Sequence, residues 1–98
     1  MAESDFTSIL SSKPKLSALL KYHSLNKEWY FLGALLEVDS DELNKIEDKY
    51  NDDRMRMVKM FGVWLEKGET PTYRKLLEAL VNIDKRDVAE SMCTEIGR

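Results

Sequence analysis

The side chains that most often carry out chemistry in proteins are few in this chain. His23 is the only histidine and Cys93 the only cysteine, so a nucleophile would have a single imidazole to act as its base. His23 falls at the end of an apolar stripe, where we expect a partly buried structural imidazole. Cys93 stands near Glu90 and Glu95, and we expect it to pack as a small apolar group rather than to react as a thiolate.

Paired carboxylates are the other candidates for acid–base chemistry. Asp52 with Asp53, or Glu47 with Asp48, could share the roles of general acid and general base if burial separated their pKa values. Adjacent residues on a helix do not face each other, however, and both pairs stand among other charged residues. The sequence therefore predicts no catalytic residue and no enzymatic activity.

The sequence also lacks the usual patterns for holding phosphates, cofactors or metals. Its four glycines are isolated from one another, so neither a P-loop nor a dinucleotide-binding loop can be drawn. One cysteine and one histidine cannot supply the usual four ligands of a zinc site. No segment has the acid and glycine spacing of an EF-hand loop. We therefore expect no cofactor and no bound metal.

Length and composition favour one soluble globular domain. The chain has 98 residues, of which 43% are hydrophobic and 34% charged, and its net charge is −3; this acidic balance argues against a general nucleic-acid surface. A lone cysteine cannot form an internal disulfide, which fits a reducing compartment such as the cytoplasm. The first residues include Glu3 and Asp5 where a signal peptide would be basic, and the longest uncharged apolar run, Trp29–Leu36, is too short to span a membrane. We expect no membrane insertion by this segment.

Apolar residues after Pro14 follow helical spacing, without the sustained alternation of a strand. The pattern predicts an all-α bundle of six helices over residues 15–98, preceded by a flexible leader over residues 1–14. Within the leader, Phe6, Ile9 and Leu10 are spaced as in one extra helical turn. The segment Ser24–Lys27 is predicted to be a break between the first two helices. The expected helix starts are Leu16, Trp29, Pro71 and Asp84, and the third and fourth helices are expected to follow N-caps at Ser40 and at Asp52 or Asp53. The expected core positions are Leu16, Leu19, Leu20 and His23; Trp29, Leu32, Leu35 and Leu36; Leu43, Ile46 and Tyr50; Met57, Met60, Phe61, Trp64 and Leu65; Tyr73, Leu76, Leu77 and Leu80; and Val88, Ala89, Met92 and Ile96.

Charge is distributed unevenly along the chain. Residues 37–53 contain eight acidic and only two basic residues, whereas the segments on either side are slightly basic. Bases gather at Arg54, Arg56 and Lys59, at Arg74 and Lys75, and at Lys85 and Arg86. One acidic face and several basic corners on a single small domain permit head-to-tail contacts between copies. The alternative is that these residues are simply solvated helix faces.

Three segments resemble the death domain of the death-fold superfamily over about Lys15 to Ile96. They are KEWYFLGALLEVDSDELNKIE (Lys27–Glu47), MFGVWL at the end of the long fourth helix (Met60–Leu65), and PTYRKLLEALVNIDKRDVAESM (Pro71–Met92). The tryptophans Trp29 and Trp64, together with the Tyr73 segment, favour the death domain proper over the death-effector and caspase-recruitment domains. The chain departs from the family in one place, where Leu36, Glu37 and Val38 replace a second Leu-Gly.

The resemblance implies six antiparallel helices in a Greek-key arrangement and no enzymatic activity. It also implies a function: homotypic docking with other death domains, as an adaptor or the cytosolic end of a receptor, to assemble apoptotic or innate-immune signalling complexes. Self-association is one form such docking takes.

The resemblance further implies which residues would contact partners. Acids of the second and third helices would form one side of a first contact, and bases of the first and fourth helices the other side. The turn before the sixth helix would meet the end of the fourth helix of a neighbour, and the third helix would supply a third contact. The residues implied are Glu37, Asp41 and Glu42 against Lys21, Arg56 and Lys59; Asp84, Lys85 and Arg86 against Lys67 and Glu69; and Glu47, Asp48 and Lys49 for the third contact.

Two other functions remain open at this level. A small nucleic-acid-binding domain of helix-turn-helix type would need a basic recognition helix, and the third predicted helix is acidic instead. An inert regulatory or structural domain would use its charges only for solubility.

Overall fold

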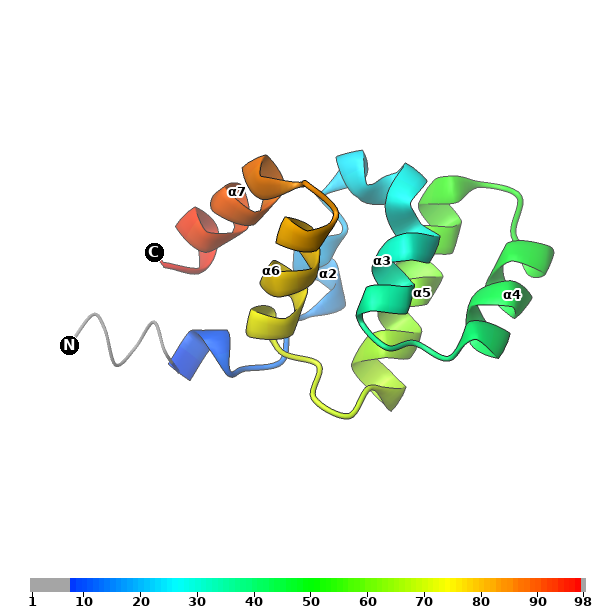
Figure 1. The fold of residues 1–98 in the computed structure, drawn as a ribbon, viewed down its shortest axis with the longest axis horizontal. Helices are drawn as coiled ribbons and strands as arrows, with labels where there is room; N and C mark the ends of the chain where they lie inside the picture. Colours follow the sequence, from blue (N-terminus) through cyan, green and yellow to red (C-terminus); the bar gives the residue numbers. More distant parts are fainter. Residues whose placement is uncertain (1–7, 98) are drawn as a thin grey trace.

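Helices and short connecting turns make up residues 8–97, the part of the chain that the computed structural model describes (Figure 1). All six predicted helices are present, and no strand occurs among these residues. A 3-10 helix, η1, precedes α3, and residues 8–10 form one more helical turn. The elements are α2 (Leu16–Leu19), η1 (His23–Glu28), α3 (Trp29–Leu35), α4 (Ser40–Lys49), α5 (Asp53–Lys67), α6 (Tyr73–Asn82) and α7 (Arg86–Ile96).

Helix α5 is the central element of the bundle. It packs against α2, η1, α3 and α4, while α6 packs against α3 and α7. Figure 1 accordingly shows α4 and α7 at opposite ends of the molecule, with α3 and α5 between them. The five residues predicted to form the stripe of α5 are all buried: Met57, Met60, Phe61, Trp64 and Leu65. This regular spacing explains why the longest helix was also the most readily predicted one.

The first helix and the segment after it differ from the prediction. Helix α2 ends at Leu19, and His23 is exposed at the start of η1 rather than partly buried. The predicted break over Ser24–Lys27 is wrong, because these residues lie within η1 and Leu25 is completely buried there. A 3-10 helix has three residues per turn, so a single apolar residue per two turns leaves no α-helical periodicity to detect.

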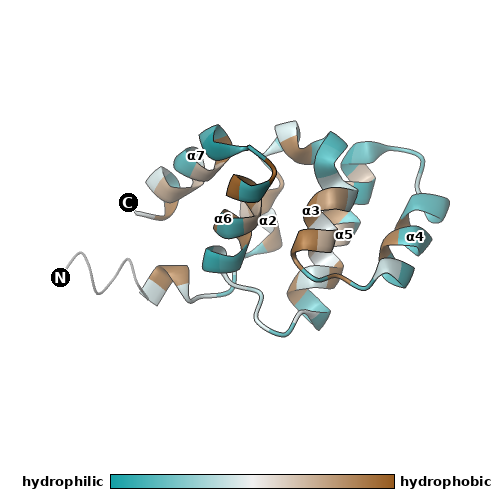
Figure 2. Ribbon diagram, in the orientation of Figure 1, coloured by the Kyte–Doolittle hydropathy of each residue, from teal (hydrophilic) through white to brown (hydrophobic). Residues whose placement is uncertain are grey.

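Leu35 was predicted to lie in the core, but 36% of its surface is exposed, and Phe31 on the same helix is 57% exposed. Helix α3 is apolar along most of its length, as the brown ribbon in Figure 2 shows, while α4 is mostly hydrophilic. Only part of the surface of α3 packs on α4, α5 and α6. Because the helix has apolar residues on every side, its sequence does not indicate which of them face inward.

Three predicted helix boundaries, those of α4, α6 and α7, shift by one or two residues, and at α4 and α6 a side-chain cap selects the first helical residue. Asp39 rather than Ser40 caps α4, its carboxylate accepting a hydrogen bond from the backbone N–H of Asp41 at 3.0 Å. Thr72 caps α6, which begins at Tyr73 and not at Pro71. Helix α5 is capped by Asp52 as predicted. Helix α7 begins at Arg86, since Asp84 forms part of the preceding turn. Aspartate, serine and threonine are all good N-caps. Because two or more of them stand close together before α4 and α6, the sequence does not indicate which one caps the helix.

Two acidic residues hold the same left-handed backbone conformation just after a helix. Glu37 has a φ of 65° and Asp84 a φ of 62°. At the end of α3, the N–H of Val38 donates to the carbonyl of Gly33 and the N–H of Glu37 to that of Ala34, which is the Schellman arrangement. The turn after α6 repeats it, with Lys85 bonded to Leu80 and Asp84 to Val81. Glu37 thus stands where the resemblance noted in the sequence would place a second glycine.

Replacing Glu37 by Gly is expected to raise the free energy of unfolding by about 1 kcal/mol, because glycine adopts a positive φ without strain and removes a negative charge from the negative end of α3. Chemical denaturation measures the change. Glu37→Ala is the matched control: it removes the charge but keeps the strained Cβ, so it should gain clearly less. Equal stability of the two variants would contradict the strain argument.

The predicted leader lies partly outside the described residues. From residue 8 onward the structure describes the chain. Residues 8–10 form a helical turn, and the carbonyl of Ser12 then accepts a hydrogen bond from the N–H of Tyr73 at 3.1 Å. Pro14 is buried. The flexible leader over residues 1–14 stays a prediction, and Phe6, expected in the extra turn, lies outside the described residues.

Candidate functional site

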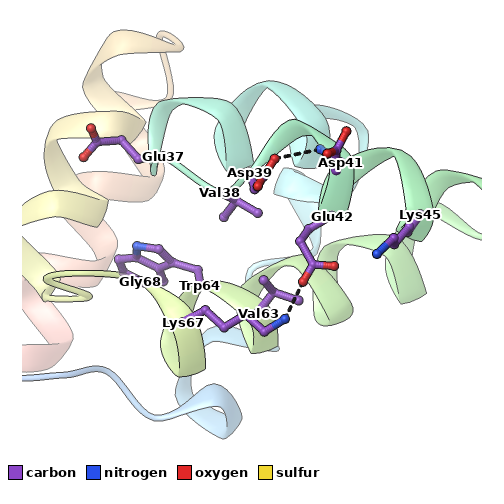
Figure 3. Close-up of a pocket in the computed structure, with 10 residues that line it drawn as sticks. All are labelled: Glu37, Val38, Asp39, Asp41, Glu42, Lys45, Val63, Trp64, Lys67 and Gly68. Atoms are coloured by element: carbon purple, nitrogen blue, oxygen red, sulfur yellow. Dashed lines mark hydrogen bonds and ion pairs between the residues drawn. The ribbon is translucent and has the colours of Figure 1, made fainter.

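An acidic groove lies between the turn after α3, the first half of α4, and the last turns of α5 (Figure 3). Its volume is about 480 Å³. Val38, Val63 and Trp64 supply apolar surface, and carboxylates stand along the α3–α4 side. The residues lining the groove are Glu37, Val38, Asp39, Asp41, Glu42, Lys45, Val63, Trp64, Lys67 and Gly68. We call this set the acidic groove.

Local sequence explains why the acids gather here. The α3–α4 turn is short, so the residue that ends α3 and the residues that open α4 come close together. Acids are favoured in the first turn of a helix because they face its positive end, and α4 has Asp41 and Glu42 there. Glu37 is exposed and is brought to the same rim by its left-handed conformation.

One ion pair crosses the acidic groove. Lys67 Nζ, on the last residue of α5, donates to Glu42 Oε2 at 2.6 Å. The hydrogen bond and charge of Lys67 lower the pKa of Glu42, and those of Glu42 raise the pKa of Lys67. Both were predicted to contact partners, but on different surfaces. The structure instead pairs them with each other. Glu37, Asp39 and Asp41 are then the rim acids that form no ion pair within residues 8–97.

The acidic groove suits a long basic side chain. Lysine and arginine bury their apolar stems against apolar surface while the charged end stays near water and counter-charges. Val38 and Val63, which are only partly buried, would contact such a stem, and the carboxylates of Asp39 and Asp41 would face the cationic end. The groove holds no nucleophile with a neighbouring base, so its chemistry is recognition of positive charge.

Arg56 is used mainly inside the fold. Its Nε donates to the carbonyl of Tyr50 at 2.6 Å, one terminal nitrogen donates to the carbonyl of Glu47 at 3.1 Å, and the other pairs with Asp53 at 3.2 Å. The side chain is 21% exposed. Because these carbonyls belong to the end of α4, Arg56 ties α4 to the start of α5, and only a small part of it remains for a partner.

Lys59 is the better placed of the α5 bases. It is exposed, and its Nζ lies 5.5 Å from the centre of the Tyr50 ring. Lys49 lies 5.6 Å from the same ring, so two predicted contact residues flank one tyrosine. Cation–π contacts at the surface are weak, and both ammonium groups remain available. Glu47 and Asp48, the other residues of the predicted third contact, are exposed on the last turns of α4.

Lys21 belongs to a small cluster at the α2–α7 junction. It forms an ion pair with Glu95, which also accepts a hydrogen bond from the Tyr22 hydroxyl at 3.1 Å. Burial and the hydrogen bond to Glu95 raise the pKa of Tyr22 to about 12. Lys21 and Glu95 are both about half exposed, so this pair contributes little to stability and is accessible to a partner.

The predicted contact around the α6–α7 turn is partly assembled. Asp84 projects from its left-handed position, and Arg86 is exposed on the first turn of α7. Lys85 is less free, with its Nζ 3.5 Å from Glu28 Oε1. On the opposite side of this predicted contact, Glu69 is exposed just after α5. It was expected, with Lys67, to meet the α6–α7 turn of a neighbour.

Sequence reasoning missed the apolar part of the acidic groove and two of its charges. Val38 and Trp64 were interpreted as turn and core residues, and Asp39 and Lys45 were not singled out. Trp64 is indeed buried, with 2% of its surface exposed. A groove arises where two elements meet, so helical periodicity within one element cannot reveal it.

Among residues 8–97, no three His, Cys, Asp or Glu side chains are grouped so as to hold a metal ion. Within the same range, no helix has both the length and the apolar content to cross a membrane.

Comparison with known families gives one match: the family model described as Death domain covers residues 13–96. Comparison with curated proteins gives no match. Comparison with solved structures gives none either.

Proposed function

The chain belongs to the death-domain family and has its all-α, six-helix fold, and on that premise we propose that it docks homotypically with other death domains through the acidic groove. Death domains are non-enzymatic protein-interaction modules, which agrees with a surface that has charged rims and no catalytic pair. The observation that carries the proposal is the acidic groove itself, in which carboxylates surround the partly buried side chains of Val38 and Val63, on a chain whose family works by binding (Figure 3).

The partner surface would be basic. Lys21 and Lys59 of a second domain have accessible ammonium groups, and a lysine stem from either could lie against Val38 while its charge meets Asp41. This contact is heterologous, because the acidic side and the basic side are different surfaces of one domain, and heterologous contacts build rings or open helical assemblies. Charges of this kind set register, partner choice and association rate more than total affinity.

The remaining predicted contacts are part of the same proposal. The α6–α7 turn, with Asp84 and Arg86, would meet Lys67 and Glu69 of a neighbour. For the first contact, Lys59 is the base to rely on, since Arg56 is engaged within the fold.

We further propose that the assembly serves apoptotic or innate-immune signalling and that the domain works in the cytoplasm, as an adaptor or as part of a receptor's cytosolic face. Support comes from the family and from a single half-buried cysteine that fits a reducing compartment.

Substituting Asp41 by Lys is expected to weaken docking tenfold or more, because the change places a cation on the rim meant to receive one. The assay titrates unlabelled domain into a fluorescently labelled trace at low salt and follows complex formation. Glu78→Lys, the same type of charge change at an exposed site on α6, is the control and should bind like the parent. Equal loss in both variants would show that net charge matters and the groove does not; unchanged binding in Asp41→Lys would remove the groove from the interface.

A further inference from the structure

Helix α3 presents an apolar face that the charged contacts do not use. Phe31 is 57% exposed, more than the other large exposed hydrophobics, and Leu35 follows one turn later on the same face with 36% exposed. Lys27, four residues before Phe31 near the end of η1, is also exposed. Single exposed apolar residues are ordinary, but an aromatic residue and a leucine at i and i+4, bordered by a lysine, form a defined contact face.

A second feature lies between helices α6 and α7. A groove of about 520 Å³ runs between them and is lined by Val81, Arg86, Ala89, Glu90, Cys93 and Thr94. We call it the α6–α7 groove. Val81 is 43% exposed, and Ala89 and Cys93 provide small apolar surface. Arg86 and Glu90 supply one positive and one negative charge at its edges.

The two features match in chemistry. The α6–α7 groove is open and shallow, and Ala89 and Cys93 are small, so a phenyl ring can lie against them without displacing a large side chain. An arginine guanidinium is attracted to the face of an aromatic ring, so Arg86 could cover Phe31. Glu90 could meet Lys27, the cation four residues before Phe31. Each element of the α3 face therefore has a counterpart at the α6–α7 groove.

We propose that the α6–α7 groove receives Phe31 of a second copy of this chain. The proposal rests on the proposed docking function in that copies must meet, and it describes an apolar contact that takes the place of the α6–α7 turn contact wherever Arg86 covers Phe31. Every copy carries both Phe31 and the α6–α7 groove, because they belong to one chain. Within one molecule α3 packs against α6 and α6 against α7, and Figure 1 shows the order of these helices. The contact can then close as a symmetric pair or continue from copy to copy.

Salt separates this contact from the charged ones. At 0.5 M salt the screening length is about 4 Å, so contacts between exposed charges are largely suppressed while burial of Phe31 is not. Sedimentation velocity at near-millimolar concentration in 0.5 M salt is expected to show association of the parent domain and a monomer for Phe31→Ser. The control is Met55→Ser, another exposed apolar residue, 40% exposed and on α5, which should associate like the parent.

Cys93 offers a direct report on the groove, because it is the chain's single cysteine and lines the groove. Its reaction with a thiol reagent is expected to slow several-fold as the parent associates, and to keep its dilute rate in Phe31→Ser. A parent that stays monomeric in 0.5 M salt but associates at low salt would overturn this contact and leave the proposed function standing. Association with unchanged Cys93 reactivity, or association that Phe31→Ser does not reduce, would overturn it equally.

Discussion

Replacing Leu25 by Ala is expected to lower the free energy of unfolding by about 2 to 5 kcal/mol. Leu25 is 0% exposed in η1, which packs against α5, so truncation leaves a cavity beside the central helix. Small domains have only about 5 to 15 kcal/mol of total stability, and the variant should therefore be partly unfolded in mild denaturant. Urea denaturation followed by circular dichroism measures the loss.

The matched control for this change is Leu35→Ala on α3. The residue type and the atoms removed are the same, but Leu35 is 36% exposed and leaves no enclosed cavity, so its loss should be smaller, about 1 kcal/mol. Similar losses in the two variants would contradict the placement of η1 against the core.

Replacing Gly33 by Val is expected to cost about 3 kcal/mol through overpacking. A Cβ at this position would lie 2.7 Å from Leu43 Cδ2 and 2.9 Å from Met60 Cγ, closer than carbon atoms approach. Glycine at this site therefore lets α3 lie against both α4 and α5. Because that packing also sets the α3–α4 turn, the variant should lose the shape of the acidic groove together with stability.

Gly62→Val is the control for Gly33→Val, measured by the same denaturation experiment. Nothing lies within 4 Å of a Cβ at Gly62 on α5, and valine is slightly better than glycine in a helix, so stability should change by less than about 0.5 kcal/mol. A Gly33→Val variant as stable as this control would mean that α3 does not approach α4 and α5 so closely.

The fold was predictable where apolar periodicity and caps agree. In α5, five buried residues at helical spacing follow the Asp52 cap and end before Gly68. Prediction failed around His23 and Leu25, because a 3-10 helix does not have the α-helical repeat. It also failed for Leu35, because a helix with apolar residues on nearly every side does not indicate which side packs against the core.

The acidic groove was predictable only as a collection of charges. The sequence shows that residues 37–53 are acidic, but not that Glu42 bonds to Lys67 across the groove or that Arg56 ties α4 to α5. Those pairings join residues 25 and 6 positions apart in sequence, and they depend on how the helices pack. Tertiary contacts therefore decide which charged residues are left for a partner.

Glu37 and Asp84 show how stability and recognition compete in this domain. Each places an acid in a left-handed position at the negative end of a helix, where glycine would be more stable. Both were also expected to contact partners. Under the proposed function, these acids lower the stability of the fold while giving the docking surface its charge.

The central claim is a heterologous contact between the acidic groove of one copy and the basic side of another, and complementation tests it most directly. Asp41→Lys disables the acidic side and Lys59→Glu the basic side, both in a Phe31→Ser background so that the apolar contact is absent. At low salt the background protein is expected to associate in sedimentation velocity, and each variant alone to associate at least tenfold more weakly. Mixed together, the two variants should form a one-to-one complex, since one keeps an intact basic side and the other an intact acidic groove. A mixture that sediments as two monomers, or variants that each associate like the background protein, would contradict the claim.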